Sequence, residues 1–256
     1  MIPDWQLPAG VDRGLHDYLR SADMVRGYDA MMAISPLAAV DIGFCERHFP
    51  TPGRLLDLGC GTGRLGRHFG PKGFEYLGVD LSEEMLAVAE SQKATERERF
   101  ANANLVELPE EFRDFDYAAC LFSTLGMIRG SENRAAALSS AHRVLRPGGR
   151  FALHVHNRYY HGVGLRGWRS GDIVMPQAYG GAPLTLHHYS LAEALRAVCG
   201  VGFRVLEAMP VSATGWLTKR WLLPKVRSYG YLIAAEKSQT ARGQTLADAT
   251  IGTERS

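Results

Sequence analysis

The sequence lacks several features that mark specialised classes of protein. Only four of its 256 residues are cysteine, and none forms a Cys-x-x-Cys pair, which argues against a zinc ribbon or a disulfide framework. No apolar run approaches the ~18 residues that span a membrane, and no signal peptide is recognised. The 29 basic residues nearly balance 27 acidic ones, so no overall positive charge indicates nucleic-acid binding. We therefore expect a globular, cytoplasmic protein without a bound metal.

Apolar, strand-like runs alternate with helix-like segments along most of the chain. Strands are predicted over residues 54–59, 74–81, 100–108, 115–122 and 150–157, with helices over 63–70, 82–92 and 132–145. One or two further helices are expected within residues 20–49, where Met24, Tyr28 and Met31 follow a helical spacing. Short, wholly apolar strands are typical of parallel sheets covered by helices on both faces. The pattern predicts an α/β fold.

The segment Asp57-Leu58-Gly59-Cys60-Gly61-Thr62-Gly63 lies where a predicted strand turns into a predicted helix. Glycines at such a turn let the backbone approach a ligand closely. A dinucleotide pyrophosphate binds at the positive end of the helix and would gain nothing from the carboxylate of Asp57. The methionyl end of S-adenosylmethionine carries an ammonium as well as a carboxylate, which suits an acid beside a glycine loop. Asp57 therefore favours S-adenosylmethionine over NAD.

A second acid, Asp80, stands near the end of the next predicted strand, in the segment Gly78-Val79-Asp80-Leu81. An acid at this position can accept hydrogen bonds from both ribose hydroxyls of an adenosine ligand. Folds that bind dinucleotides and folds that bind S-adenosylmethionine share this arrangement, so Asp80 does not choose between them. Leu81 would offer an apolar surface to adenine, and a core position is the alternative.

Four segments together resemble the successive motifs of class I S-adenosylmethionine-dependent methyltransferases. These are LLDLGCGTGRL, YLGVDLSEEML, the Leu108-Pro109 to Phe115-Asp116 spacing, and RVLRPGGRFALHV. The residues of these motifs resemble those of the group that includes the ubiquinone- and menaquinone-biosynthesis methyltransferases, and the resemblance covers about residues 50–157. It implies a Rossmann-like three-layer sandwich with a seven-stranded, mostly parallel sheet whose last strand is antiparallel. It also implies S-adenosyl-L-methionine as the cofactor and S-adenosyl-L-homocysteine as the product.

The resemblance assigns cofactor contacts position by position. It implies that the loop glycines hold the methionyl part, Asp57 its ammonium and Asp80 the ribose. Asn104 falls where the family often has an Asp facing the adenine amino group, and the next backbone N–H would meet the ring. The predicted cofactor-binding residues are Tyr28, Asp57, Gly59, Cys60, Gly61, Gly63, Asp80, Leu81, Asn104, Leu105, Leu121 and Phe122.

Histidines cluster at the end of the predicted strand 150–157. A base is required only where the methyl acceptor must lose a proton, and His is the usual choice near neutral pH. The catalytic candidates are His156, Asn157 and His161. For His154, a core position within the sheet is favoured, and for His156 and Asn157 a structural role is equally open. No carboxylate partner lies nearby in sequence, so a metal site is not predicted.

Two segments fall outside the family's common core. Residues 158–186 are rich in glycine and aromatics, and we expect them to form a lid over the acceptor, with Tyr159, Tyr160, His161, Trp168 and Tyr179 facing the substrate. The alternative is a β-hairpin that extends the sheet or makes a dimer contact. Residues 214–228 combine four basic residues with two tryptophans. This insert could contact RNA or weakly contact a membrane surface, or its tryptophans could cover the sheet edge.

The domain and function predictions follow from these features. We expect one methyltransferase domain over residues 1–238, with an N-terminal helical cap over 1–50 and a disordered tail over 239–256. The segment after the strand 115–122 is not the Asn/Asp-Pro-Pro-Tyr/Phe motif of base N-methylation, which disfavours DNA. The prediction is a methyltransferase acting on a small molecule, lipophilic or phenolic in character. A tRNA methyltransferase and a non-catalytic S-adenosylmethionine-binding protein remain as alternatives, and the oligomeric state is not predicted.

Overall fold

The computed structural model describes residues 3–160, 170–176, 181–216 and 228–238. Its main sheet has the strand order β3-β2-β1-β4-β5-β10-β8-β9. The strands are β1 (Arg54–Leu58), β2 (Glu75–Asp80), β3 (Glu98–Asn102), β4 (Phe115–Cys120), β5 (Leu145–His156), β8 (Phe203–Ser212), β9 (Gly215–Trp216) and β10 (Gly230–Lys237). Strands β1 to β5 pair in parallel, whereas β10 runs antiparallel to both β5 and β8. The predicted seven-stranded sheet with an antiparallel last strand is confirmed, and the two-residue β9 adds an edge.

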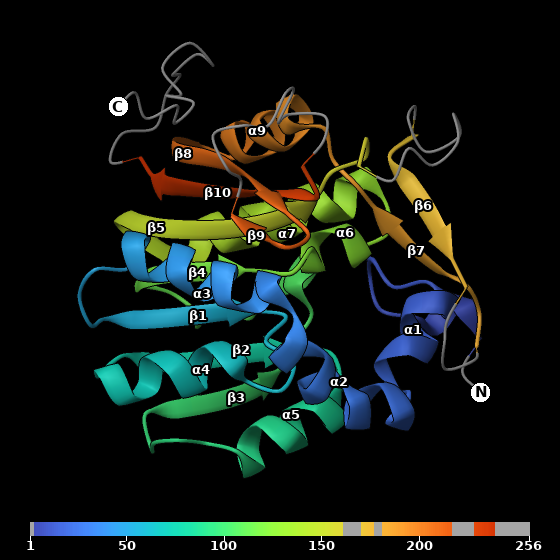
Figure 1. Cartoon of the computed structure of the whole chain (residues 1–256), viewed down its shortest axis with the longest axis horizontal. Coiled ribbons are helices and arrows are strands. Elements are labelled where there is room, and N and C mark those ends of the chain that lie inside the picture. Colours follow the sequence, from blue (N-terminus) through green and yellow to red (C-terminus); the bar gives the residue numbers. More distant parts are fainter. Residues whose placement is uncertain (1–2, 161–169, 177–180, 217–227, 239–256) are drawn as a thin grey trace.

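The sheet is the middle of three layers. Its described helices are α1 (Arg13–Leu19), α2 (Ala22–Ile34), α3 (Pro36–His48), α4 (Arg64–Phe69), α5 (Glu83–Ser91), α6 (Thr124–Met127), α7 (Ser131–Val144) and α9 (Leu191–Gly200), with short 3-10 turns at Asp4–Gln6, Gly70–Lys72 and Leu105–Glu107. Figure 1 shows α3 and α4 in front of the sheet and α7 behind it. Successive residues of β1 explain this arrangement, because Leu55 joins the core under α3 and α4 while Leu56 joins the core under α7 and α9.

Local sequence signals start several helices. The Ser82 hydroxyl accepts a hydrogen bond from the Met85 N–H, 3.2 Å away, and so caps α5, within the helix predicted over 82–92. Ser190 and Glu193 form a reciprocal capping box at the start of α9. Residues 20–49 hold two helices, α2 and α3, as predicted, and α1 before them was not predicted. Pro36 begins α3 immediately after α2, and the two axes diverge by 72°.

A small second sheet lies beside the N-terminal helices. Strands β6 (Asp172–Met175) and β7 (Leu184–His187) pair with each other and not with the main sheet. Leu15 of α1 packs with Leu184 and Leu186 of β7, and Figure 1 shows the hairpin next to α1. The described part of residues 158–186 therefore does not extend the main sheet. Within the described ranges, no single helix has the length and hydropathy to cross a membrane, and α2 with α3 pass that test only together, across their bend.

Candidate functional site

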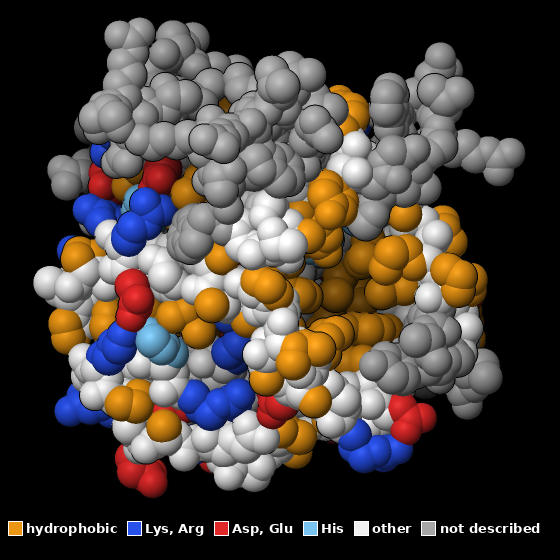
Figure 2. Space-filling model, viewed as in Figure 1, with side chains coloured by type: hydrophobic (Ala, Val, Ile, Leu, Met, Phe, Trp, Pro, Cys, Tyr) orange, Lys and Arg blue, Asp and Glu red, His pale blue; other side chains and the backbone are white. Residues whose placement is uncertain are grey.

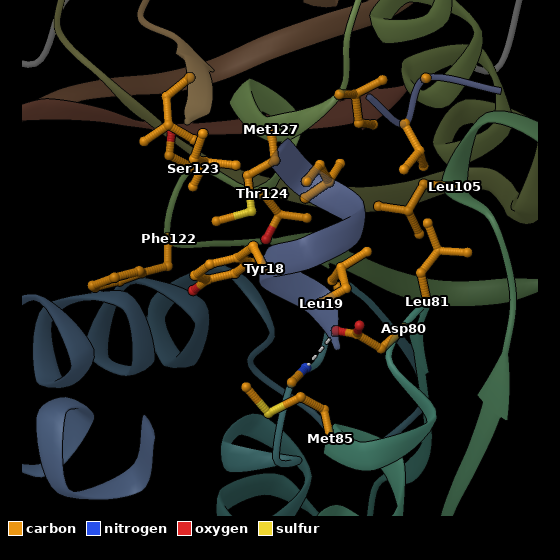
Figure 3. A pocket seen from close by; sticks show the side chains of 18 of the residues that line it. Tyr18, Leu19, Asp80, Leu81, Met85, Leu105, Phe122, Ser123, Thr124 and Met127 are labelled. Atoms are coloured by element: carbon orange, nitrogen blue, oxygen red, sulfur yellow. Dashed lines mark hydrogen bonds between the residues drawn. The ribbon is translucent and has the colours of Figure 1, made fainter. Parts of the chain in front are cut away.

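A pocket of about 320 Å³ lies at the carboxyl ends of the central strands. Its walls come from the glycine-rich loop after β1, the ends of β2, β4 and β5, the N-terminal helices and the β6–β7 hairpin. Figure 2 shows a hollow bordered by hydrophobic side chains on this face, and Figure 3 gives the lining residues in detail. This edge is where ligands bind in open α/β sheets.

The glycine-rich loop has a backbone that only glycine adopts easily. Gly59, Gly61 and Gly63 have φ angles of 78°, 54° and 79°, all in the left-handed region. Gly59 and Gly61 line the pocket. A Cβ on Gly61 would lie 3.3 Å from the ring of Tyr28, another lining residue. Gly63 is not a lining residue; a Cβ there would lie 2.8 Å from the Phe100 ring, so Gly63 allows the start of α4 to pack closely on the sheet.

Asp80 at the end of β2 joins the loop to the pocket. One carboxylate oxygen accepts a hydrogen bond from the Gly61 N–H and the other from the Ser82 N–H, each at 2.9 Å. The side chain lines the pocket, and Figure 3 shows it between Leu81 and Met85. Burial raises the pKa of Asp80, and these backbone N–H groups oppose the rise. The carboxylate therefore fixes the loop and also faces the space where the resemblance places a ribose.

Asp57 is buried near the end of β1, behind the glycine-rich loop. Its side chain is 4% exposed and is not part of the pocket lining. It accepts a hydrogen bond of 2.7 Å from the Tyr76 hydroxyl. Burial raises the pKa of Asp57 to about 6, while the Tyr76 hydrogen bond lowers it. The Asp57 carboxylate is thus held by Tyr76 behind the loop, and its contact with a methionyl ammonium stays a prediction. Cys60 and Leu121 are likewise buried outside the lining.

Asn104 lines the pocket, and both polar atoms of its side chain form hydrogen bonds with the backbone. Its Oδ1 accepts a hydrogen bond from the Val106 N–H and its Nδ2 donates to the Ala9 carbonyl, both at 3.0 Å. Leu81 and Leu105 supply apolar surface beside it, and Figure 3 shows these two leucines on one side of the pocket with Phe122 on the opposite side. The predicted acceptance from an adenine amino group must therefore use the second lone pair of the Asn104 oxygen.

The turn after β4 is strained. Phe122 and Ser123 have φ angles of 52° and 64°, which cost non-glycine residues of the order of 1–3 kcal/mol each and are typical of functional sites. Hydrogen bonds hold this turn against β5: the Ser123 N–H donates to the His154 carbonyl at 3.0 Å, and the Ser123 hydroxyl accepts from the His156 N–H at 3.2 Å. The turn puts Phe122, Ser123 and Thr124 on the pocket wall.

The three predicted catalytic residues have different positions. His156 lines the pocket and is 8% exposed, with its ring centroid 4.7 Å from that of Tyr229 and 5.2 Å from that of His188. Asn157 is fully buried outside the lining. Its amide donates to the Ser228 carbonyl at 2.8 Å and its oxygen accepts from the Tyr159 N–H at 3.1 Å. The Asn157 side chain thus makes structural contacts with Ser228 and Tyr159, and its catalytic role stays a prediction. His161 lies outside the described residues.

His154 occupies the core. It is fully buried, and its Nδ1 lies 2.7 Å from a carboxylate oxygen of Asp41, which is also fully buried. Arg64 approaches the other Asp41 oxygen at 3.4 Å. This network ties α3 to β5 and α4, so His154 has the structural role that the sequence favoured. Among the described residues, no group of three or more potential ligands could hold a metal ion.

Sequence analysis missed most of the wall that the N-terminal helices build. The overlooked lining residues include Leu15, Tyr18, Leu19, Met24, Met31, Thr124, Met127 and Tyr229. The helical spacing of Met24, Tyr28 and Met31 signalled an apolar face, but only Tyr28 of that face was predicted to reach the cofactor. The placement depends on Asp29, which accepts hydrogen bonds from the buried Thr62 hydroxyl at 2.5 Å and from the Gln92 amide at 3.0 Å.

Comparisons with known proteins agree with this architecture. The family described as "Methyltransferase domain" matches residues 55–149. A Bacillus subtilis protein named as the methyltransferase YqeM is 31% identical over 133 residues. This match covers 52% of the present chain and 53% of YqeM. A ubiquinone biosynthesis O-methyltransferase of Idiomarina loihiensis is 27% identical over a match that covers 66% of this chain and 69% of the relative.

Solved structures show the same fold. The 1,6-didemethyltoxoflavin-N1-methyltransferase of Burkholderia thailandensis, crystallised with its acceptor and S-adenosylhomocysteine, superposes with a TM-score of 0.62 at 21% identity, covering 91% of this chain and 93% of its own. The CcbJ methyltransferase of Streptomyces caelestis superposes with a TM-score of 0.66 at 17% sequence identity. The match covers 84% of this chain and 96% of the CcbJ chain.

The fold and the loop define a Rossmann-like methyltransferase architecture. Residues 55–149 match the methyltransferase domain family, and the chain shares its fold with S-adenosylmethionine-dependent methyltransferases. It spans about half the length of the first curated relatives that it matches.

Proposed function

We propose that this protein transfers a methyl group from S-adenosylmethionine to a small, lipophilic acceptor that bears a hydroxyl group, such as a phenol. The observation that carries the proposal is one pocket that joins the Gly59–Gly61 loop and Asp80 to a buried imidazole, His156. The relative from Idiomarina loihiensis is named for ubiquinone biosynthesis, and another relative, of Pseudescherichia vulneris, is named a malonyl-[acyl-carrier protein] O-methyltransferase, which supports a small or carrier-bound acceptor.

The residues present fit the cofactor. Asp80 offers a carboxylate to ribose hydroxyls, Leu81 and Leu105 offer flat apolar surface to a base, and the bare Cα of Gly61 leaves space that a side chain would fill. Asp57 stands behind the loop, so we propose that loop carbonyls also contact the methionyl ammonium. When bound, S-adenosylmethionine supplies an activated methyl group on a good leaving group.

The chain's own contribution is alignment, exclusion of water and removal of a proton. Alignment alone can contribute ~7–11 kcal/mol to such a transfer. His156 is the one described imidazole that lines the pocket, and we propose that it accepts the hydroxyl proton of the acceptor. Tyr229 and Phe122 pack edge-on to its ring and shield it from solvent.

The hairpin completes the acceptor side. We propose that the described part of residues 158–186, the β6–β7 hairpin, forms a wall over the acceptor, because Met175, Leu184 and Leu186 line the pocket. Tyr159 and Tyr160 are described but are not lining residues, whereas His161, Trp168 and Tyr179 lie outside the described residues. Most of the basic segment 214–228 is also outside them, so no described contact favours an RNA substrate. We place the reaction in the cytoplasm, since free thiols such as Cys45 and Cys120 suit a reducing compartment.

The test uses calorimetry and a transfer assay on the full chain. We expect S-adenosylhomocysteine to bind at micromolar strength, NAD and NADP not to bind, and a radiolabelled methyl group to pass to members of a panel of phenols and catechols. Tight binding of NAD would overturn the assignment. Binding of S-adenosylhomocysteine without transfer to phenols, amines, carboxylates or tRNA would favour a non-catalytic binding protein.

A further inference from the structure

One buried histidine joins the two strands of the small hairpin to a helix of the main domain. The side chain of His187 in β7 is 4% exposed. Its Nδ1 lies 2.8 Å from a carboxylate oxygen of Asp172, its cross-strand partner in β6. Its Nε2 lies 3.0 Å from a carboxylate oxygen of Glu193 in α9. The ring also packs edge-on to Tyr189, with centroids 4.6 Å apart. We call His187, Asp172 and Glu193 the clasp.

The geometry of the clasp specifies the charge of the imidazole. A carboxylate only accepts hydrogen bonds, and a neutral imidazole has a single N–H. Burial raises the pKa of Glu193, but the hydrogen bond from His187 and the charge of Arg158 bring that pKa below its ordinary value. Glu193 is therefore ionised. His187 can donate to Asp172 and Glu193 at the same time only as the imidazolium.

The charged groups around the imidazole complete a balanced cluster. Arg158, just after β5, pairs with Glu193. Arg129, between α6 and α7, lies 3.9 Å from Asp172 and 3.0 Å from Asp12, the residue that caps α1. These described groups are three acids and two guanidiniums. A protonated ring makes the cluster neutral, whereas a neutral ring leaves it with one net negative charge.

The outer strand of the hairpin depends most on the clasp. Leu184 and Leu186 of β7 are buried in a cluster with α1. Figure 1 shows β6 on the outer side of β7, and Val174 and Met175 of β6 are exposed. A two-stranded ribbon has little stability of its own. Loss of the Asp172 contact would therefore loosen the strand that brings Met175 to the pocket wall.

We propose that His187 is a positioning residue that holds β6 in the pocket wall only while its ring is protonated. The relevance of that wall to a methyl acceptor rests on the proposed function, whereas the clasp itself does not. As the pH rises and the ring loses a proton, one nitrogen presents a lone pair to a carboxylate. Glu193 keeps Arg158 as a partner, whereas Asp172 is 36% exposed and can turn to water. The side of the clasp that opens is therefore β6.

Hydrogen–deuterium exchange of residues 170–176 in the full chain follows β6 directly. After correction for the intrinsic effect of pH, we expect β6 to open about 10- to 100-fold more often at about pH 9 than at about pH 6, the range for a lost hydrogen bond to a charged group. In His187→Gln opening should be frequent at both pH values, because the amide replaces only one ring nitrogen. In Asp172→Asn it should stay rare at both, because the Asn amide can donate to a neutral imidazole. The control His142→Gln, on α7 against Phe203, should behave as the wild type.

The outcomes test the clasp and the proposed function separately. ¹⁵N NMR of the histidine rings, assigned with His187→Gln, should show two protonated nitrogens on His187 at about pH 6 and one at about pH 9. An unchanged number of protons, or wild-type exchange that does not respond to pH, would overturn the proposal. It is also overturned if Asp172→Asn opens as often as His187→Gln at the higher pH. The wild-type exchange profile needs no variant, so a variant that fails to fold cannot leave the proposal undecided. Failure of S-adenosylhomocysteine to bind would remove the proposed function and leave these measurements valid.

Discussion

The Asp80 carboxylate accepts a hydrogen bond from the Gly61 N–H, 2.9 Å away. This contact links the end of β2 to the middle of the glycine-rich loop, so one residue both shapes the loop and faces the pocket. The loop geometry and the polar contact to a ribose are consequently coupled. A change at either residue should be detected first in cofactor affinity.

Replacing Asp80 with Ala should weaken binding of S-adenosylhomocysteine by roughly 2–3 kcal/mol, because a charged acceptor for ribose hydroxyls is lost. Calorimetric titration measures the change. Asp80→Asn retains one acceptor oxygen and should fall between Ala and the wild type. Equal affinity of all three proteins would show that the ribose lies elsewhere.

Gly61→Val should abolish cofactor binding while leaving the protein folded. The φ of 54° strains any branched residue, and the new Cβ would lie 3.3 Å from Tyr28, in the space open to the ligand. Gly200→Val is the matched control, because a Cβ on Gly200 meets nothing within 4 Å. Circular dichroism checks the fold of both variants and calorimetry checks their binding. Normal binding by the Gly61 variant would contradict the role given to the loop.

The pKa of Asp57 predicts a pH dependence of stability. Its folded-state pKa of about 6 lies above the ordinary aspartate value of 3.8, so the folded state holds the proton more tightly than the unfolded state does. The resulting stabilisation is complete below about pH 4 and is lost as the pH rises through 6. Relative to Asp57→Asn, the wild-type protein should therefore lose up to ~3 kcal/mol of unfolding free energy across this window.

Urea denaturation at several pH values measures this difference. The test is how the difference in unfolding free energy between the two proteins changes with pH. The size of that difference at one pH is not informative, because Asn also alters the hydrogen bond to Tyr76. A difference between the two proteins that stays constant from pH 4 to 7 would show that Asp57 ionises normally inside the fold.

His156→Gln should reduce transfer to a hydroxyl acceptor by ~10²–10⁴-fold, the usual contribution of a general base, with unchanged affinity for S-adenosylhomocysteine. The control is His142→Gln, on α7 against Phe203, which should keep full activity. The rate of the wild type should rise with pH as an imidazole loses its proton, and this limb should vanish in the variant. A surviving limb would assign the proton acceptor to another group.

Deleting residues 160–183 and inserting a short Gly-Ser bridge should leave cofactor binding intact while transfer to the true acceptor disappears. The deletion removes β6 with Met175, whereas the loop and Asp80 are untouched. Calorimetry and the transfer assay give the two readouts. Full turnover by the shortened protein would mean that α1 and α2, with Tyr18 and Tyr28, hold the acceptor alone.

Much of the fold follows from local sequence. Apolar runs such as residues 54–59 bury both faces and predict a central parallel strand, and Ser82 predicts the start of α5, because these signals act over a few residues. The loop glycines predict a left-handed backbone for the same reason. Asp80 could be placed because a residue at the end of a central strand has its position fixed by the sheet.

Tertiary structure decided which of these residues reach the pocket. Asp57 and Asn157 sit beside the loop and the strand end in sequence, but packing turns Asp57 toward Tyr76 and Asn157 toward Ser228. The wall from α1, α2 and the hairpin depends on contacts between residues far apart in the chain, such as Asp29 with Thr62. Sequence alone therefore determined the fold and the kind of cofactor, because local patterns encode them. Only the folded chain decided the shape of the acceptor site, because the side chains that form it meet through long-range packing.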